Sequence, residues 1–573
     1  MNYKTPGVYV EELAKFPPSV AQVETAVPAF VGYTAKGPQK PTRISSMLEY
    51  ENLFGKANQE DFAVAFKDGV ATATQTSVSD YKMYYAMQMY FANGGGPCYI
   101  VSVGNYTDPV MADSTNPADK TLLKGLELLK KEDEPTLIVF PDLQGLVANA
   151  DDVAAATALE TIAVSNKTVA TDAQTAAQAV VASVAGADAA AAGTAALAKA
   201  NTYTINNTST SSQIAAYYAA QAVAAAAKTA ALVANATVTT VKSAAQAAAA
   251  VFDKYVTIAA QKATAATATK NAASSRFNDT SISKVYSLYN SALSQAEFMK
   301  DRFVIMDVLG DDTIFRSKVT GSGLKYGAAY YPNLKTVLNY DFNEAEVLVT
   351  GVSGIASLED LKYSNSDLYN QAKNAIDSKQ VIMAPSSAMA GVYAKVDGTA
   401  GVFKAPANVG LNYVVAPTEK ISQERQDGLN VDVVAGKSIN AIRTFTGKGT
   451  MVWGARTLDG NSNEWRYVSV RRFFNMVEES VKKSTERFVF EPNTANTWIR
   501  VQTMIENFLN QQWRDGALAG SKPEEAYYVS VGLNKTMSAQ DILEGRMIIE
   551  VGMAAVRPAE FIILRFSHKL QEA

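Results

Sequence analysis

Helical periodicity is clearest in the last hundred or so residues of the chain. Between residues 467 and 493, apolar side chains recur every three or four positions, at Val470, Phe473, Phe474, Val477, Val481 and Phe488. A second stripe with this spacing runs through residues 496–520, at Trp498, Val501, Ile505, Phe508, Leu509 and Trp513. Such stripes predict two amphipathic helices that pack one face on a core. Gly516 is expected to end the second helix, because glycine tolerates a left-handed backbone. Two apolar runs, 526–531 and 546–551, are predicted strands for these helices to cover.

Both ends of the chain carry strand patterns without an evident partner. Residues 560–568 are apolar on both faces, which is typical of a strand covered on both sides. Residues 7–11 alternate as a strand within an extended stretch, 1–25. Each strand needs a sheet edge, either in the same molecule or in a neighbouring one. The pattern alone leaves both arrangements open.

Residues 26–146 and 281–383 have a mixed α/β pattern. Strands are predicted at 28–35, 98–104, 135–142 and 302–311, and helices at 46–54, 80–96, 122–130, 282–298 and 367–377. Strand 135–142, helix 282–298 and strand 302–311 form one crossover unit. Further along, 439–445 and 450–454 are predicted strands joined by a glycine-containing turn.

An alanine-rich stretch, 147–280, interrupts that crossover before its helix and is therefore interpreted as an insertion. Alanine is the best helix former, but each alanine buries only about one methyl group. A helical hairpin or bundle on the surface is expected. The alternative is a partly disordered decoration.

Composition restricts the classes of partner. The 573 residues include 52 Lys and Arg against 56 Asp and Glu, a net charge of −4, which gives no indication of a nucleic-acid or anionic-membrane partner. The single cysteine, Cys98, excludes an intrachain disulfide. The first residues lack the apolar segment of a secretory signal peptide, and no run of about twenty apolar residues predicts a membrane span.

No constellation of residues predicts catalysis. The only histidine, His568, lies in the apolar segment near the end, so a histidine-based triad or metal site would have to use it. The acidic pairs at 151–152 and 311–312 lack the further ligands that calcium needs. We expect no catalytic, cofactor-binding or metal-ligating residues and no enzyme activity. A carboxylate enzyme is the weakest alternative.

Several motifs together carry a family resemblance. They lie at 5–12 (TPGVYVEE), 27–38 (VPAFVGYTAKGP), 384–408, 454–460 (GARTLDG) and in the C-terminal run with YVSVRR, FEPN, WRDGALAG and VRPAEFI. In this order they resemble the contractile sheath proteins of phage tails and related contractile injection systems. The motifs cover both ends and much of the middle. They leave out residues 147–280, where the sequence departs most from the family pattern.

The resemblance implies a multi-domain, mixed α/β (α+β) fold with terminal strands shared between subunits. The expected parts are an N-terminal arm (1–25), an α/β middle domain (26–146 plus 281–383), a helical surface insertion (147–280), a C-terminal core domain facing an inner tube (384–557) and a C-terminal arm strand (558–573).

The implied function is mechanical. Subunits would polymerise as stacked hexameric rings around an inner tube and contract to drive that tube through a target envelope. The expected partners are the protein itself, the inner tube protein, and baseplate and terminal cap proteins, with no cofactor, nucleic acid or membrane insertion. The protein would be made in the bacterial cytoplasm and assembled into a phage tail or tail-like particle, which in some systems is released from the cell. The alternative function is a static structural or adhesive protein that binds through the alanine-rich lobe.

Two groups of residues follow from the resemblance. The expected inter-subunit arm residues are Gly7, Val8, Tyr9, Val10, Glu11, Phe561, Ile562, Ile563, Leu564, Arg565 and Phe566. The expected tube-facing residues are Arg471, Arg472, Lys482, Lys483 and Arg487. Glutamates share that helical region, so the alternative for the second group is a solvated helix face with intrahelical ion pairs.

Overall fold

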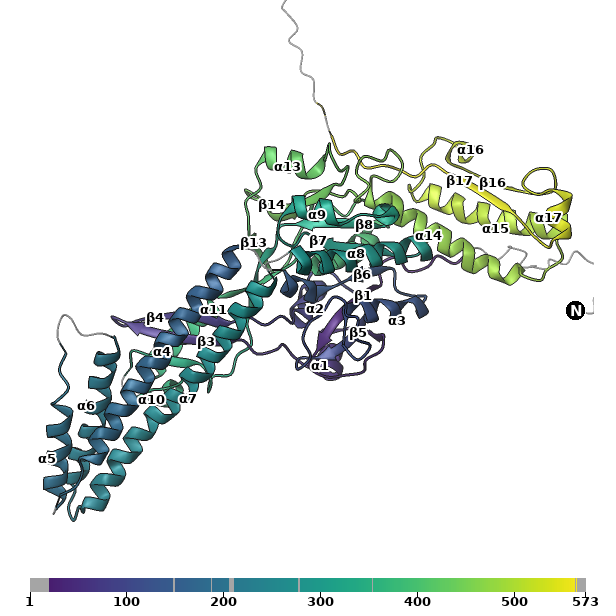
Figure 1. The fold of residues 1–573 in the computed structure, drawn as a ribbon. Coiled ribbons are helices and arrows are strands. Elements are labelled where there is room, and N and C mark those ends of the chain that lie inside the picture. Colours follow the sequence, from purple (N-terminus) through teal and green to yellow (C-terminus); the bar gives the residue numbers. More distant parts are fainter. Residues whose placement is uncertain are drawn as a thin grey trace, which may run out of the picture.

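The computed structural model describes residues 20–147, 150–186, 188–205, 211–276, 279–352, 354–561 and 563. It is elongated, with a central α/β body between a long helical arm and a C-terminal lobe (Figure 1). Of the helices described, none combines the length and the apolar character needed to cross a bilayer. The mixed α/β fold class predicted from the sequence is confirmed.

A nine-stranded sheet forms the centre of the body. Its order is β12 (Val409–Gly410), β15 (Gly449–Val452), β14 (Ile439–Phe445), β8 (Gly327–Tyr331), β7 (Phe303–Asp307), β6 (Leu137–Val139), β1 (Pro28–Thr34), β5 (Cys98–Asn105) and β2 (Thr42–Ile44). The strands from β14 to β5 are parallel, and antiparallel strands flank them on each side. Every residue of β1 and β7 is buried, as expected for parallel strands covered on both faces.

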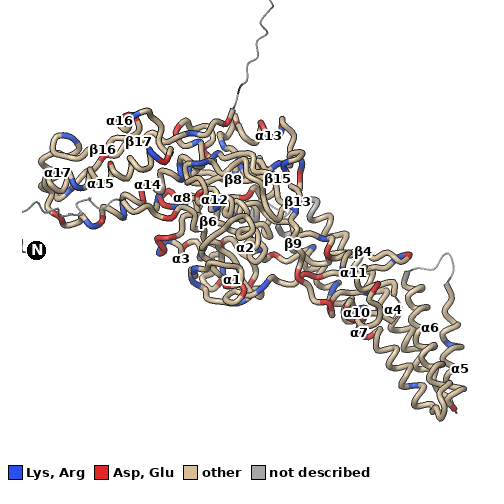
Figure 2. The backbone as a smooth tube through the Cα atoms, turned by 180° about the vertical axis from the view of Figure 1, so that it is seen from behind, with Lys and Arg blue, Asp and Glu red and all other residues tan. Residues whose placement is uncertain are grey.

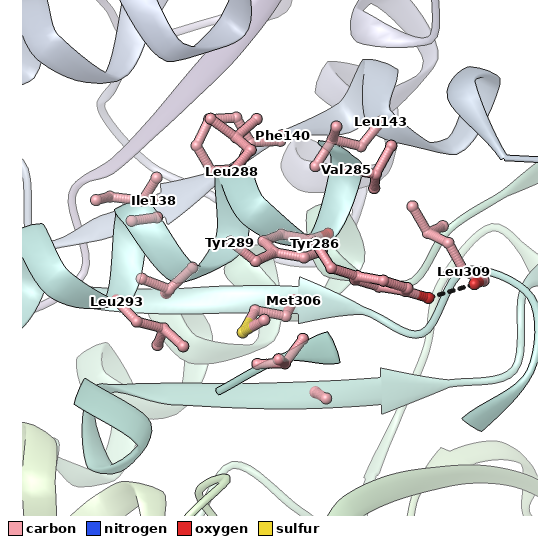
Figure 3. Packing of buried hydrophobic residues seen from close by; sticks show 14 of the residues in the cluster. Ile138, Phe140, Leu143, Val285, Tyr286, Leu288, Tyr289, Leu293, Met306 and Leu309 are labelled. Atoms are coloured by element: carbon pink, nitrogen blue, oxygen red, sulfur yellow. Dashed lines mark hydrogen bonds between the residues drawn. The ribbon is translucent and has the colours of Figure 1, made fainter. Parts of the chain in front are cut away.

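Helices cover both faces of this sheet. On one face lie α3 (Leu122–Leu128), α8 (Asp279–Met299) and α9 (Asp312–Lys318), whose apolar residues join the cluster drawn in part in Figure 3. There, Tyr286 and Leu293 of α8 pack over the sheet beside Met306 of β7, and the Tyr286 hydroxyl donates a hydrogen bond to the Leu309 carbonyl. On the other face, α1 (Met47–Phe54), α2 (Met83–Ala92) and α12 (Ser386–Ala400) contribute to a second cluster.

The predicted crossover is confirmed, because β6 and β7 pair in parallel and α8 precedes β7. The alanine-rich insertion enters the chain between β6 and α8. Its predicted helices are confirmed as α4 (Ala150–Ala182), α5 (Ala189–Ala200), α6 (Ser211–Ala231) and α7 (Val238–Arg276). Alanine and valine side chains form their shared core. The outer half of this helical arm carries few charged residues (Figure 2).

Two three-stranded sheets were not anticipated from the sequence. One contains β10 (Leu348–Thr350), β3 (Asp61–Lys67) and β4 (Val70–Ser77), and it packs on α10 (Leu358–Ser364) and α11 (Ser366–Asp377). Tyr255 and Ile258 of α7 pack on its other side, so the base of the helical arm rests on this sheet. The other contains β11 (Gln380–Met383), β9 (Leu334–Asn339) and β13 (Val414–Pro417).

The C-terminal lobe contains both predicted amphipathic helices, α14 (Val468–Thr485) and α15 (Ala495–Arg514). Gly516 follows α15 with a positive φ of 85°, as expected of the residue that ends it. The predicted strands are β16 (Tyr527–Val531) and β17 (Ile549–Met553), which pair with each other. The remaining short helices of the described chain are α13 (Gln423–Asn430), α16 (Pro523–Ala526) and α17 (Ala539–Leu543). Its 3₁₀ turns lie at Leu129–Lys131, Pro141–Leu146, Ser322–Tyr326 and Glu486–Phe488.

The nine-stranded sheet takes strands from both sides of the predicted boundary at 383/384, since β14 pairs with β8. Of the predicted strand 560–568, residues 560, 561 and 563 are described, and they are not in a strand of this chain. The remainder of that segment and the predicted strand 7–11 lie outside the described residues.

Replacing Leu293 with alanine tests the packing of α8 on the sheet. Leu293 is buried in the cluster of Figure 3, so truncation should leave a cavity and lower the free energy of unfolding by about 2–5 kcal/mol. Urea unfolding followed by circular dichroism would measure the loss. Leu232→Ala, at an exposed position of the helical arm, is the control and should change stability by less than about 0.5 kcal/mol. Equal losses for the two variants would contradict this account.

Candidate functional site at the two chain ends

The segment that precedes β1 is anchored to α12 and α14. The Val23 amide donates a hydrogen bond to Ser480 Oγ at 3.1 Å, and the Thr25 hydroxyl donates to Asp397 Oδ2 at 2.6 Å. Val20 is buried in the apolar core of the C-terminal lobe. The chain therefore leaves the body from a defined position on the lobe.

A buried ion pair fixes this position. Arg472 Nη2 lies 2.5 Å from Asp397 Oδ2, and the two side chains are 3% and 6% exposed. The same nitrogen donates to the carbonyl of Thr25 at 2.9 Å, and the guanidinium lies over the ring of Tyr393. Removing one partner of a buried pair leaves an uncompensated charge and is strongly destabilising. We call Arg472, Asp397 and Thr25 the N-terminal anchor.

A second ion pair holds the other end of the chain. Glu560 receives hydrogen bonds from Arg456 Nη2 at 2.6 Å and Arg456 Nε at 2.9 Å. Asn430 Nδ2 donates to it at 2.8 Å, and the Tyr467 hydroxyl donates at 3.2 Å. The Arg456 side chain is almost fully buried. We call Glu560, Arg456, Asn430 and Tyr467 the C-terminal anchor.

The charge state of Glu560 follows from these contacts. Burial raises its pKa, but hydrogen bonds from Arg456 and Asn430 and the positive charge of Arg456 outweigh burial and hold the pKa below its usual value. Glu560 is therefore ionised at neutral pH, and both of its oxygens accept hydrogen bonds.

Beyond the C-terminal anchor, apolar side chains point to solvent. Phe561 is 69% exposed and Ile563 is 77% exposed. Beside them lies a groove of about 720 Å³ whose lining includes Phe403, Trp453 and Pro558. Exposed apolar side chains such as these gain free energy from contact with another surface, because the contact removes them from water.

The two-stranded sheet of the lobe offers such a surface. β16 and β17 pair over five residues, from Tyr527 opposite Met553 to Val531 opposite Ile549. No third strand joins this sheet in the described part of the chain, so each strand keeps one edge with unpaired backbone groups. A pair of strands is marginally stable without further strands or helices. Here α15 covers one face.

The five residues expected to face a tube have different surroundings in the structure. Arg471 and Arg472 are buried: Arg471 pairs with Glu478 at 2.9 Å and lies over the Trp465 ring, and Arg472 belongs to the N-terminal anchor. Lys482 and Lys483 are more exposed and both pair with Glu479, at 3.1 and 3.4 Å, as the intrahelical alternative expects. Arg487 lies over the Phe488 ring.

Of the expected arm residues, the structure describes Phe561 and Ile563. Gly7, Val8, Tyr9, Val10, Glu11, Ile562, Leu564, Arg565 and Phe566 lie outside the described residues, as does His568. Asp311 and Asp312 have structural partners, since Asp311 caps α9 and Asp312 pairs with Arg425 at 2.7 Å. Within the described ranges, no three His, Cys, Asp or Glu side chains group as metal ligands.

The anchors escaped the sequence analysis because their partners are distant in sequence. Arg456 and Glu560 are 104 positions apart, and Asp397 and Arg472 are 75 apart. Neither pair follows a helical or strand period. All four residues lie in motifs that carry the resemblance: Asp397 at 384–408, Arg456 at 454–460, Arg472 in YVSVRR and Glu560 in VRPAEFI. The motifs gave no sign of which residue pairs with which.

Comparisons with known proteins agree with that resemblance. Residues 461–569 match the family described as phage tail sheath C-terminal domain. A comparison with curated proteins gave no significant match.

Solved structures match over almost the whole chain. A chain from the contracted helical sheath of the anti-feeding prophage is 27% identical, with a TM-score of 0.53 and coverage of 99% of this chain and 100% of that one. A chain from the contracted PVC sheath complex of an extracellular contractile injection system is 25% identical, with a TM-score of 0.52 and coverage of 100% and 99%. A chain from the six-fold symmetrised anti-feeding prophage baseplate is 28% identical, with a TM-score of 0.53 and coverage of 99% and 100%.

Substitutions in the C-terminal anchor should release residues 554–561. Arg456→Leu and Glu560→Gln remove charge-assisted hydrogen bonds of about 1.5–3 kcal/mol, so amide exchange in this segment should accelerate about ten-fold or more at pH 7. Hydrogen-exchange mass spectrometry of unassembled protein measures this. Arg443→Leu is the matched control, because Arg443 bonds to Gln423 and Gln426 instead. Unchanged exchange in the Arg456 variant would contradict the anchor.

The effect of Glu560→Gln should depend on pH. Because the pKa of Glu560 is lowered in the folded protein, its stabilising effect is present at neutral pH and is lost as the pH falls through that lowered value. Wild type and Glu560→Gln should therefore differ in exchange at pH 7, and the difference should shrink as the pH is lowered through acid values below the ordinary glutamate pKa of about 4.3. Comparing the two proteins at each pH cancels the intrinsic exchange rate. A difference that does not change with pH down to the acid unfolding of the protein would show that the carboxylate charge is not what holds the segment.

Proposed function

We propose that this chain, which is similar to contractile sheath proteins, polymerises as stacked hexameric rings around an inner tube and contracts to drive that tube through a target envelope. Two of the chains it matches come from sheaths in the contracted state. A third comes from a six-fold symmetrised assembly, which supports rings of six.

The proposal rests on two features of the structure taken together. Both ends of the described chain are anchored, and β16 and β17 each have an open edge. Residues 5–12 and 560–568 of neighbouring copies would add to the free edges of β16 and β17 and complete a four-stranded sheet. Strand addition of this kind gains backbone hydrogen bonds along the whole edge. It also explains why the chain ends are held by ion pairs, since a donated strand must start from a fixed point.

The proposed mechanism needs no reacting group. Each body would rotate as a nearly rigid unit while the donated strands keep neighbouring copies connected. Additional contact between bodies would supply the energy. Each further 100 Å² of buried apolar surface contributes about 2.5 kcal/mol before the costs of ordering are subtracted. Summed over many copies in a sheath, modest gains per subunit become a large driving force.

The proposed partners are further copies of the chain, the inner tube protein, and baseplate and cap proteins. The match to a chain from a baseplate structure supports the proposed association with baseplate proteins. We keep Lys482, Lys483 and Arg487 as charged residues near the tube. Arg471 and Arg472 would act indirectly, by fixing the helix that carries them. The particle would be assembled in a bacterial cytoplasm as a phage tail or tail-like particle.

Deleting either arm tests the exchange of strands. Variants that lack residues 5–12 or residues 561–568, with Glu560 retained, should fold but fail to form sheath-like tubes, because the edges of β16 and β17 stay unpaired. Negative-stain electron microscopy of the protein expressed alone measures assembly, and circular dichroism measures folding.

The control is Leu232→Ser, at an exposed apolar position of the helical arm. This substitution should leave tubes unchanged. Normal tubes from either deletion would refute strand exchange. Monomers alone from wild-type protein would favour a static protein over a sheath.

A further inference from the structure

The turn between α14 and α15 holds an aromatic side chain entirely in solvent. Phe490 has a relative exposure of 103%, and its φ is +69°. Left-handed backbone is uncommon for a bulky residue and persists only where the surrounding structure imposes it. The preceding Val489 is 61% exposed. We call Val489 and Phe490 the apolar tip.

Hydrogen bonds and packing on both sides fix this turn. Phe488 is buried in the core of the lobe. The Val489 amide donates to the Glu486 carbonyl at 3.1 Å, and the Glu491 amide donates to the Phe488 carbonyl at 3.0 Å. The outward direction of Phe490 is therefore a property of the folded turn, although the ring adds nothing to the packing of its own chain.

The groove beside the C-terminal anchor lies at the opposite end of the same two helices. Its lining includes Tyr467, which precedes α14, and Gly516, which follows α15. The apolar tip, in contrast, lies between the end of α14 and the start of α15. Helix α14 has 18 residues and is about 27 Å long. One chain therefore cannot place its own tip in its own groove.

The groove has the size and the walls to receive an aromatic ring. Its volume of about 720 Å³ is ample for more than one side chain. Phe403, Trp453 and Pro558 contribute apolar walls, and Trp453 is 38% exposed, so its ring is accessible. A further aromatic ring can pack on these two in the edge-to-face or offset geometry that aromatic pairs prefer.

The charges around the two surfaces are opposite in sign. Residues 486–491, which include the apolar tip, carry two glutamates and one arginine. In the groove lining, Arg456 and Glu560 already pair with each other. Of the three other charged side chains in that lining, two are the cations Lys404 and Arg557. Complementary charge of this kind favours the matched orientation over others.

We infer that the apolar tip of one copy docks in the groove of the next copy, with the Phe490 ring against Phe403 and Trp453. The inference rests on the proposed polymerisation of this chain. Each copy supplies one tip and one groove, so the two surfaces are matched in number. Because they are different surfaces, the contact is heterologous and passes from copy to copy in a ring or an open helix.

Crosslinking between two single-cysteine variants tests the contact. Val489→Cys places a thiol beside Phe490 and leaves the ring in place, and Ala407→Cys places a thiol in the groove. The native Cys98 is buried and will not compete. In an equal mixture under assembly conditions, a short bifunctional thiol reagent should give covalent dimers, whereas either variant alone should give monomers. Leu232→Cys, exposed on the helical arm, is the matched control for Val489→Cys and should give no dimer with Ala407→Cys.

A double variant tests the direction of the contact. A protein that carries both Val489→Cys and Ala407→Cys should give a ladder of trimers, tetramers and longer products, because every copy then offers two reactive surfaces. Dimers from Val489→Cys alone would show that tips meet tips and would overturn the inference. Monomers from the mixture would also overturn it, and would mean that another segment or another protein fills the groove. Absence of tubes from wild-type protein would count against the proposed function, while the crosslinks in the concentrated mixture still decide the inference.

Phe490→Asn separates docking from folding. Asparagine accepts left-handed backbone more readily than phenylalanine, so the free energy of unfolding of the unassembled protein should stay the same or rise. The protein concentration at which tubes form should nevertheless rise about ten-fold or more, because one buried aromatic side chain often dominates an interface. Sedimentation of tubes across a concentration series measures this. Phe490→Tyr keeps the ring and should assemble nearly as wild type does. Unchanged assembly of Phe490→Asn would overturn the inference.

Discussion

Two arginine–carboxylate pairs, one buried and one with its carboxylate partly exposed, hold the points at which the two ends of the described chain leave the folded body. Arg472 with Asp397 fixes the entry into β1, and Arg456 with Glu560 fixes the exit after β17. Buried ion pairs contribute little net stability compared with apolar packing, but breaking one is costly, so they specify position more than they stabilise. In a protein whose proposed function depends on strands passed between copies, position is what the anchors must supply.

Outside the anchors, the molecule combines a tightly packed body with a lobe whose small sheet has open edges in the described part of the chain. The nine-stranded sheet is covered by apolar clusters on both faces, which makes the body suited to moving as one piece. The lobe, in contrast, contains a two-stranded sheet that no third strand joins in the described part of the chain. Rigid body and open sheet are complementary in the proposed function, in which strands from neighbouring copies complete the sheet.

Regular periodicity made α14, α15 and the β6–α8–β7 crossover predictable from sequence. The hairpin of β3 and β4 had a readable signal as well, since Asp68 and Gly69 form the turn and both have positive φ. Helix α12 gave no stripe because it is buried on most sides. Arg471 and Arg472 looked like surface charges on a helix, yet the lobe and body enclose them, and their partners Trp465 and Asp397 lie outside α14. Long-range pairing of this kind leaves no local pattern to read.

In a sheath that contracts as proposed, the helical arm would act as a lever. Helix α7 has 39 residues and is about 58 Å long, and the base of the arm is held against β3 and β10. If the body turns about a pivot near the lobe, a rotation of about ten degrees carries the end of α7 sideways by about 10 Å relative to its base. The far end of the arm would thus move farther than its base. Anything bound to the far end of α7 would be carried through a longer arc than the body itself.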